Sequence, residues 1–277
     1  MSQVRCHRKP DLMRRISILT CLIAVSYFFL QSSRPVERLS GPAILSTEPA
    51  ASGVLTRLNF NDSIKSLYHA MDVKRLGLDY TVFRQAMTGF YQLRHEGAIN
   101  NKNIVTIIDF SKPGTEKRFY TLDLTDRRVL FHTYVAHGRN TGQNLAEMFS
   151  NTQHSNQSSL GFVVTAETYT GSKGYSLRLD GKEANFNSNV RKRAVVIHAA
   201  PYATEEWINR YGRLGRSQGC PALPPSLSRE IIDTIKNGTA VFTYYPDDTY
   251  LRTSRYLKTD NLFEVLDQQY ADMIGAR

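Results

Sequence analysis

The chain has 277 residues, of which 41% are hydrophobic and 22% are charged, and its formal net charge at pH 7 is +10. Residues 1–34 carry six basic residues and one acidic one, so the rest of the chain, with 29 basic and 24 acidic residues, has a net charge of only +5. The Lys and Arg residues outside this segment are scattered, which argues against nucleic acid as a partner. The roughly 240 residues that follow are enough for one large β domain with helical additions or for two small domains.

The first 33 residues have the layout of a secretory signal peptide or a signal anchor. Five basic residues lie within the first 15 positions, and a mostly apolar run follows at residues 16–30. This run is shorter than the about 20 residues that a bilayer span needs, which favours cleavage but leaves membrane anchoring through residues 16–30 open. The sequence therefore predicts export to the periplasm or cell envelope, with an inner-membrane tether as the alternative to cleavage. Residues 34–60, rich in Pro, Ser, Gly and Ala, are predicted to be a linker.

A small helical prelude is predicted over residues 61–98. An Asn-Asp-Ser cluster at 61–63 is suited to cap a short helix that ends near Met71. A second helix is predicted over residues 80–95, because apolar residues recur there at spacings of three and four and Gly97 follows as a stop signal. The aromatic stripe of these helices is interpreted as core.

From residue 103 the pattern changes to short runs rich in β-branched and aromatic residues, separated by turn-forming residues. Seven strands are predicted, at residues 104–110, 118–123, 129–136, 160–165, 175–179, 194–198 and 240–245. Further helices are predicted at residues 204–211, 226–236 and 260–274. The predicted fold class is mainly β (α+β), a β-sandwich or barrel with an N-terminal helical pair and a C-terminal helix. The β-rich domain is expected over residues 99–250 and a C-terminal helical extension over residues 251–277.

The chain has three cysteines, and Cys220 is the only one outside the predicted signal segment. It follows a polar, glycine-rich loop, and His198 lies upstream at the end of an apolar run. Together a thiol and an imidazole make a nucleophile at neutral pH, because the base takes the thiol proton. The N–H groups of Gly219 and Cys220 are then suitable donors to a developing oxyanion. The alternative is an unreactive buried cysteine beside an ordinary core histidine.

An Ile-His strand end followed by Ser-x-Gly-Cys resembles the signature of the L,D-transpeptidase (YkuD-like) catalytic domain, in particular its murein L,D-transpeptidase branch. In this chain the signature residues are Ile197, His198, Ser217, Gly219 and Cys220. Three longer phrases, at residues 106–111, 135–142 and 212–223, agree with the family in order, and the resemblance covers roughly residues 60–250.

The resemblance implies a YkuD-like catalytic domain that acts on peptidoglycan stem peptides. Cys220 would attack the carbonyl of an L-centre linked to a D-residue and form a thioester. His198 would take the thiol proton and return it to the leaving amine, and in such domains a backbone carbonyl commonly orients this histidine. Ser217 would support the loop or the oxyanion site.

The sequence departs from the commoner family motif at several positions. Gln218 stands where a His usually precedes Gly-Cys, and Ala199 stands where a Gly often follows the strand-end His. Residues 221–222 are Pro-Ala instead of an apolar residue followed by Arg or Asn. The last change removes the usual partner of a substrate carboxylate, and Arg216 or Arg213 is the candidate replacement. Gln218 and Arg216 are therefore assigned to substrate binding.

Two residues of the 135–142 phrase complete the predicted site. His137 and Gly138 are assigned to the substrate-binding or oxyanion region. His137 is expected either to line the substrate cleft or to hold the polar loop at residues 140–159. No spacing typical of a metal site occurs, and no metal or cofactor is expected.

Three functions remain open. The first is L,D-transpeptidation, with an amine as acceptor. The second is L,D-carboxypeptidase or wall-peptide hydrolase activity at the same site, with water as acceptor. The third is a non-catalytic wall-binding protein.

Overall fold

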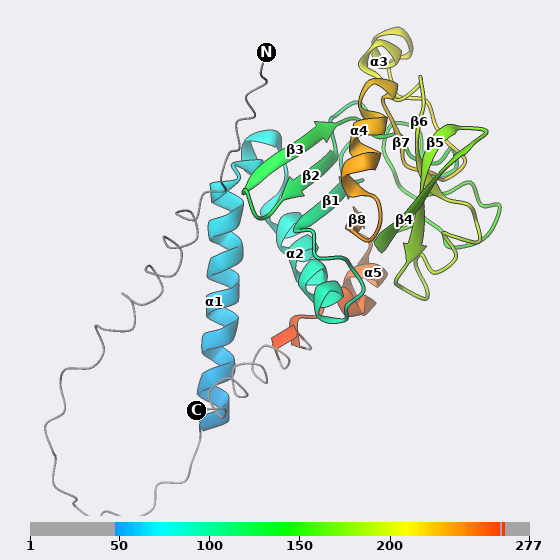
Figure 1. Ribbon diagram of the computed structural model, residues 1–277. Helices are drawn as coiled ribbons and strands as arrows, with labels where there is room; N and C mark the ends of the chain where they lie inside the picture. Colours follow the sequence, from blue (N-terminus) through cyan, green and yellow to red (C-terminus); the bar gives the residue numbers. More distant parts are fainter. Residues whose placement is uncertain (1–47, 261, 264–277) are drawn as a thin grey trace, which may run out of the picture. The chain divides into compact units, whose positions relative to one another are not determined.

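The computed structural model describes residues 48–260, 262 and 263 (Figure 1). The predicted signal segment at residues 1–33, most of the predicted linker and nearly all of the predicted C-terminal helix lie outside these residues. No helix in the described part of the chain is both long enough and apolar enough to cross a membrane.

Two helices precede the strands, as predicted. Helix α1 spans Glu48–Ala70 and α2 spans Tyr80–His95, with the short 3-10 helix η2 (Val73–Leu76) between them. The Asp79 side chain caps α2 by accepting a hydrogen bond of 2.7 Å from the backbone N–H of the second helical residue. Helix α1 begins earlier than predicted, inside the expected linker. That segment has no sustained apolar period but contains Ala, Leu and Arg, which favour helix.

All seven predicted strands are present, and a very short eighth strand completes one mixed sheet. The strands are β1 (Ile104–Asp109), β2 (Phe119–Asp123), β3 (Arg128–Thr133), β4 (Gly161–Gly171), β5 (Gly174–Gly181), β6 (Val196–Ala199), β7 (Ala222–Leu223) and β8 (Ala240–Tyr244). Their order across the sheet is β3-β2-β1-β8-β4-β5-β6-β7. The β1–β8 and β6–β7 pairs are parallel, and the other neighbours are antiparallel.

Both faces of the central strands are buried. On β1, Val105 packs into the cluster that includes α1 and α2, whereas Ile108 packs into the cluster that includes helix α4 (Pro225–Ile235). Strand β8 alternates in the same way, with Phe242 in the first cluster and Val241 in the second. In the view of Figure 1, α4 lies between strands β1–β3 and strands β4–β6. Strands buried on both faces form continuous apolar runs, which is why the sequence predicts them well.

The chain that follows β3 connects the two edges of the sheet. Ala136 and Ala222 form a bridge, with N–H···O distances of 2.9 and 3.2 Å in the two directions, and Gly138 pairs with Ser217. These contacts nearly close the sheet into a barrel, in agreement with the predicted fold class. We call this junction, formed by residues 134–138 and 215–223, the seam. Strand β7 was not predicted because it has only two residues and follows a proline.

The remaining helices lie outside the strand pairing. Helix α3 (Glu205–Tyr211) and helix α4 occur where predicted, whereas α5 (Asp248–Thr253) and the 3-10 helix η3 (Arg255–Leu257) are additional. Buried Glu183 connects α5 to the sheet, because its carboxylate accepts hydrogen bonds from the Phe162 N–H at 2.7 Å and from the Tyr250 hydroxyl at 3.1 Å.

Candidate active site

The pairing of β6 with β7 brings His198 near the loop that carries Cys220, which ends just before β7. His198 of β6 is in register with Ala222 of β7, two residues after Cys220. The Val196 N–H, two residues before His198, points at the Cys220 sulfur with an N···S distance of 3.4 Å. The two residues of the predicted dyad therefore converge, although they are separated by the whole of α3 and the glycine-rich loop.

His198 is held in one orientation by the backbone. The residue is 3% exposed, and its Nδ1 lies 2.8 Å from the carbonyl oxygen of Ala199. A carbonyl oxygen only accepts hydrogen bonds, so Nδ1 carries the proton and Nε2 keeps a free lone pair. Burial lowers the pKa of His198, and the positive charge of Lys173 lowers it further, against the opposing effect of the Ala199 hydrogen bond. The imidazole is consequently neutral at pH 7 and able to accept a proton.

The Cys220 thiol is protonated at rest. Burial raises its pKa, while the Val196 N–H and the positive charges of Arg193 and Lys173 lower it. The sulfur lies 3.8 Å from the Ala194 carbonyl oxygen, which is a suitable acceptor for the S–H. Among the described residues no hydrogen bond joins the sulfur to His198. Catalytic hydrogen bonds are often long without substrate and tighten only when it binds, so the pairing of Cys220 with His198 stays a prediction.

Arg193 is a part of the site that sequence reasoning missed. Its guanidinium donates four hydrogen bonds to the loop at residues 150–159, to Ser150 O and Ser159 Oγ at 2.6 Å each, Gln157 O at 2.6 Å and Ser155 Oγ at 3.1 Å. A Cβ atom built on Gly219 would lie 3.5 Å from Arg193 Nη2, so the guanidinium borders the cysteine loop.

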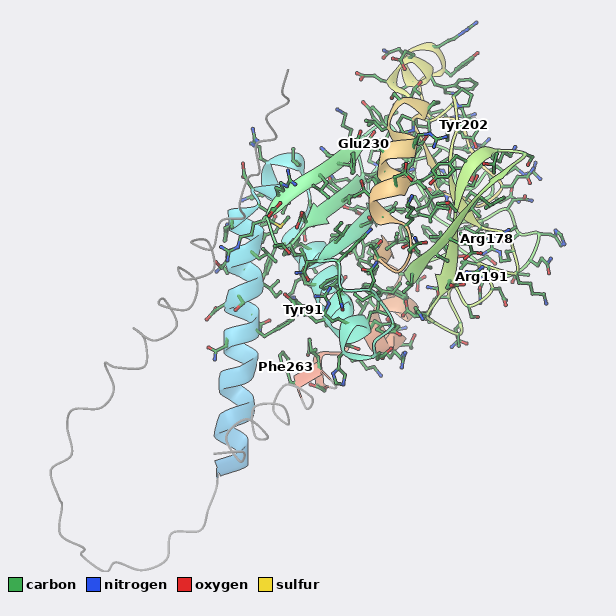
Figure 2. The ribbon with its side chains drawn as sticks, viewed as in Figure 1. Tyr91, Arg178, Arg191, Tyr202, Glu230 and Phe263 are labelled. Atoms are coloured by element: carbon green, nitrogen blue, oxygen red, sulfur yellow. The ribbon has the colours of Figure 1, made fainter. Side chains whose placement is uncertain are left out.

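Its neighbour Arg191 plays a different role. Arg191 points to the surface, where it shares Glu167 with Arg178 and also pairs with Asp180 (Figure 2). The sequence places both arginines in one basic cluster and contains no signal that separates them. Both arginines lie in one hydrogen-bonded turn, in which the Arg193 N–H donates to the Asn189 carbonyl at 2.8 Å, and residues two positions apart in such a turn face different directions.

Ser217 fixes the loop that carries Cys220. Its hydroxyl donates to the Cys220 carbonyl oxygen at 2.6 Å and accepts from the Gly219 N–H at 3.0 Å. This supports the predicted role of Ser217 in holding the loop. It also occupies the Gly219 N–H, one of the two predicted oxyanion donors. In the described part of the chain the Cys220 N–H has no acceptor, so it is the donor available to an oxyanion in this conformation.

Glycine is required at two points where the loop is tightly packed. Gly219 has φ of 117°, and a Cβ there would lie 2.8 Å from the Gln157 carbonyl oxygen. A Cβ on Gly138 would lie 2.4 Å from the Asn156 carbonyl oxygen and 2.9 Å from the Gly219 Cα. Gly138 therefore permits close approach of the cysteine loop, while its own N–H donates to Ser158 Oγ at 3.0 Å. Gln218, which lies between the buried residues Ser217 and Gly219, is exposed.

The backbone of His137 pairs with the cysteine loop at Ser217, and its side chain contacts neighbouring groups through both ring nitrogens. Its Nδ1 is 2.7 Å from Nη2 of fully buried Arg118, and its Nε2 is 3.3 Å from the Gly142 carbonyl oxygen. Since Arg118 only donates, Nδ1 accepts and Nε2 carries the proton. Burial and the Arg118 charge lower the pKa of His137 to about 4. Of the two roles expected for His137, these contacts support the one of holding the 140–159 loop.

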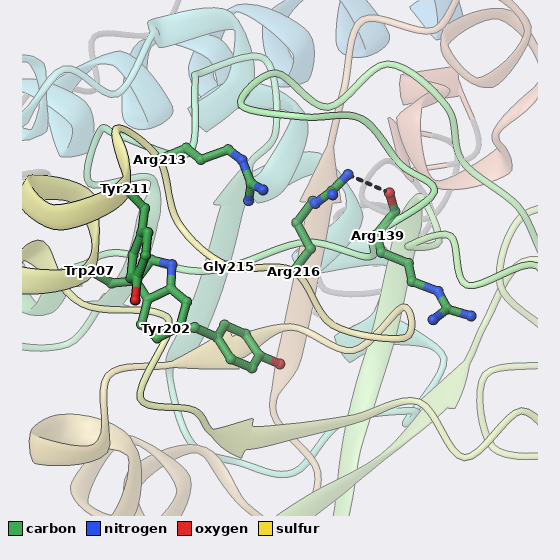
Figure 3. Close-up of a pocket in the computed structure, with 7 residues that line it drawn as sticks. All are labelled: Arg139, Tyr202, Trp207, Tyr211, Arg213, Gly215 and Arg216. Atoms are coloured by element: carbon green, nitrogen blue, oxygen red, sulfur yellow. Dashed lines mark hydrogen bonds between the residues drawn. The ribbon is translucent and has the colours of Figure 1, made fainter.

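The predicted anion clamp lies beside the cysteine loop. Arg213 and Arg216 border a pocket of about 390 Å³, together with Arg139 and with aromatic residues at and near α3 (Figure 3). Arg216 Nη1 donates to the carbonyl oxygens of Arg139 at 2.9 Å and Gly142 at 3.2 Å, which holds its side chain in place. Both arginines proposed as replacements for the missing family residue therefore lie at one pocket.

Comparisons with known proteins identify one matching family. Residues 74–244 match the family model described as L,D-transpeptidase catalytic domain. Similar solved structures include an L,D-transpeptidase from Mycobacterium smegmatis, with 14% identity, a TM-score of 0.33 and coverage of 52% of this chain and 59% of that chain. Another is the L,D-transpeptidase (Yku) from Stackebrandtia nassauensis, with 16% identity, a TM-score of 0.31 and coverage of 66% and 76%. No curated protein matches the chain.

The first of these structures is covered over less than two thirds of its length, and the structural scores are low, so the assignment depends on the sequence match. That match includes more than half of the chain and contains both His198 and Cys220. The chain belongs to the L,D-transpeptidase catalytic domain family.

Proposed function

We propose that the chain is a cysteine acyltransferase that acts on peptidoglycan stem peptides, with Cys220 as nucleophile and His198 as general base and acid. The observation that carries this proposal is the state of His198 at the seam. Its Nδ1–H is fixed on the Ala199 carbonyl, and its Nε2 is left free on the strand beside Cys220. A free, oriented imidazole nitrogen is what a protonated thiol needs for activation.

In the first half-reaction, His198 Nε2 takes the proton of the Cys220 thiol. The thiolate attacks the carbonyl carbon of the L-centre, and the Cys220 N–H donates to the developing oxyanion. The amide C–N bond then breaks, the imidazolium gives its proton to the leaving amine of the D-residue, and a thioester remains on Cys220. Ser217 acts by holding the loop, because its hydroxyl bridges the Cys220 carbonyl and the Gly219 N–H.

In the second half-reaction, an acceptor attacks the thioester carbonyl. His198 removes a proton from the acceptor, the C–S bond breaks, and the proton returns to the sulfur. An amine of a neighbouring stem peptide gives a crosslink, whereas water gives a shortened stem. Such chemistry belongs in the cell envelope, consistent with the export predicted from residues 1–33.

The purified protein incubated with tetrapeptide muropeptides tests the proposal. Crosslinked dimers are the expected product, and they require Cys220. If tripeptide stems are the only product, the activity is hydrolysis at the same site and not transfer. An unchanged substrate with wild-type protein would leave a non-catalytic wall-binding protein as the better description, and equal turnover by Cys220→Ala would exclude Cys220 as the nucleophile.

A further inference from the structure

The pocket beside the cysteine loop has two chemically different halves. Three guanidinium groups border one half and three aromatic rings the other, and the residues are Arg139, Arg213, Arg216, Tyr202, Trp207 and Tyr211. Figure 3 shows the aromatic rings grouped on one side, with the arginine side chains on the other. The pocket of about 390 Å³ is therefore built from α3, from the loop before Cys220 and from the chain after Gly138.

The pocket borders the loop that carries Cys220. Arg216 directly precedes Ser217, which bonds to the Cys220 backbone. The Gly215 N–H donates to the Tyr202 carbonyl at 2.8 Å, and a Cβ on Gly215 would lie 2.4 Å from the Tyr202 Cβ. Burial and the negative charge of a Cys220 thiolate raise the pKa of Tyr202 to about 12, as expected for a residue close to the sulfur. A ligand that fills this pocket is thus placed beside the reacting thiol.

The three arginines have no acidic partner among the described residues. The ion pairs of that part of the chain involve other arginines, such as Arg178 and Arg191. The pKa of Arg216 is lowered by burial and by the nearby charge of Arg213, so the two guanidinium groups repel one another. Arg216 is nevertheless held by the Arg139 and Gly142 carbonyls, and Arg213 by the Leu214 carbonyl at 2.8 Å. Fixed, unpaired guanidinium groups form a site ready for a carboxylate.

Two of the three aromatic rings come from α3, a helix with no buried residue, and Tyr202 precedes that helix. Helix α3 presents Trp207 and Tyr211 with ring centroids 4.5 Å apart, and Tyr211 is 52% exposed. Thr204 caps the helix by accepting a hydrogen bond of 3.3 Å from the Trp207 N–H, which fixes the tryptophan backbone. Partly exposed aromatic rings that are held by a cap, next to unpaired positive charge, are typical of a binding surface.

We propose that this pocket is a substrate subsite in which Arg213 and Arg216 bind a free carboxylate of the stem peptide while Trp207 and Tyr211 contact the adjoining aliphatic part. The inference depends on the proposed function, because peptide chemistry at Cys220 is what brings such a ligand to the pocket. It assigns to this chain's own arginines the role left open by the Pro-Ala pair at residues 221–222.

Trp207 provides a direct test, since it is the only tryptophan of the chain. The Cys220→Ser variant of the full chain, which cannot form the thioester, is titrated with a stem tetrapeptide and with the same peptide carrying carboxamides. We expect a saturable change in Trp207 fluorescence, with the carboxamide peptide binding about tenfold or more weakly. With Arg213→Gln and Arg216→Gln added, the two peptides should bind within about twofold of one another.

The matched control is Arg252→Gln, which removes a positive charge on α5, outside the pocket, and should keep the preference for the carboxylate. Arg139→Gln is a second pocket variant in case the double variant unfolds, and it should weaken the preference in part. Equal binding of the two peptides by the Cys220→Ser protein would overturn the proposal, as would an undiminished preference in the double variant. Fluorescence changes saturated by inorganic phosphate, with no competition by the peptide, would also overturn it.

The readout is independent of catalysis. If the wild-type protein fails to transfer or hydrolyse stem peptides but Trp207 still distinguishes carboxylate from carboxamide, the proposed function fails while the subsite stands. If transfer occurs and Trp207 makes no distinction, the subsite fails while the proposed function stands.

Discussion

His137 belongs to the seam and His198 lies beside it on β6, and the two side chains differ in their hydrogen bonds. Both are buried, with exposures of 3% and 2%, and burial lowers the pKa of both. His137 is hydrogen-bonded through both ring nitrogens, to Arg118 and to Gly142, whereas His198, among the residues that the structure describes, is bonded only through Nδ1. A neutral imidazole with one free nitrogen is a base, and one with both nitrogens engaged is a structural link.

The comparison extends to the surroundings of each ring. Around His137, buried Arg118 donates to the Val135 and Lys112 carbonyls and stacks over Phe110, with 5.0 Å from its guanidinium carbon to the ring centroid. Around His198, the Ala199 carbonyl accepts from Nδ1, Ser176 is in register on β5, and the charge of Lys173 lowers the pKa of the ring. The surroundings of His137 thus hold its ring through both nitrogens. In the described part of the chain, those of His198 leave Nε2 without a hydrogen bond.

The largest expected effect is the loss of activity in His198→Asn. The Asn amide keeps a donor near the position of Nδ1 and removes the base, so transfer from tetrapeptide muropeptides should fall by about 10²–10⁴-fold. The melting temperature of this variant should differ little from that of the wild type. His137→Gln is the matched variant, and it should lose stability while retaining most of the activity of the folded fraction. If both variants lose activity equally at equal folded fraction, the distinction between the two histidines is wrong.

Replacement of Arg118 by Met tests the structural side of the comparison. The substitution removes four hydrogen bonds and leaves the Val135 and Lys112 carbonyls and His137 Nδ1 without their donor. We expect the free energy of unfolding, measured by urea denaturation, to fall by about 3 kcal/mol. Arg128→Met, at an exposed ion pair with Asp126, is the control and should have little effect. An Arg118→Met protein as stable as the control would show that the hydrogen bonds of Arg118 make no net contribution to the free energy of unfolding.

The pH dependence of stability tests whether His137 is neutral in the folded chain. The pKa of His137 is about 4 in the folded chain against about 6.5 when unfolded, so the unfolded state binds this proton more readily. The stability contributed by His137 is therefore complete above pH 6.5 and decreases as the pH falls toward 4, by up to about 3 kcal/mol.

Asp109 and Glu183 act in the opposite direction over this range, because burial raises the pKa values of both carboxyls. The difference between the wild type and His137→Gln isolates the histidine, and it should shrink steadily between pH 6.5 and 4. A constant difference in the free energy of unfolding across that range would contradict the assignment of a buried neutral His137.

The smallest expected effect concerns Arg193. Its positive charge lowers the pKa of the Cys220 thiol, so Arg193→Met should move the pH of half-maximal iodoacetamide labelling upward. Labelling at pH 7 should slow by roughly tenfold or less. Arg191→Met removes an exposed arginine from the same basic cluster and should leave the labelling profile unchanged. Identical labelling profiles for Arg193→Met and Arg191→Met would show that Arg193 does not affect the Cys220 thiol.

Much of the fold could be predicted because its signals are local. The seven longer strands are apolar runs bounded by turn residues, and α2 has both a regular apolar period and a cap. Strand β7 was missed because two residues carry no period, and it pairs only through contacts with distant residues such as His198 and Ala136. The start of α1 at Glu48 was missed because helix propensity without an apolar stripe resembles a linker.

The sequence offers the two residues of the candidate dyad by their types, whereas the surroundings of these residues could not be predicted. Cys220 and His198 are chemically distinctive, so a motif identifies them before the seam is known. Arg193 and Arg191 are identical residues two positions apart, and only the folded turn that holds them shows that the Arg193 charge acts on the thiol. The engagement of both nitrogens of His137 likewise depends on Arg118, which arrives from another strand.

The most direct test of the central claim is to trap the acyl-enzyme. Wild-type protein is mixed with a stem tetrapeptide, quenched in acid and analysed by mass spectrometry of the peptide that contains Cys220. The account predicts a thioester of the tripeptide mass on Cys220, which accumulates much more slowly in His198→Asn and is absent in Cys220→Ala. Turnover of the tetrapeptide by the Cys220→Ala protein, or an acyl adduct on another residue, would contradict it.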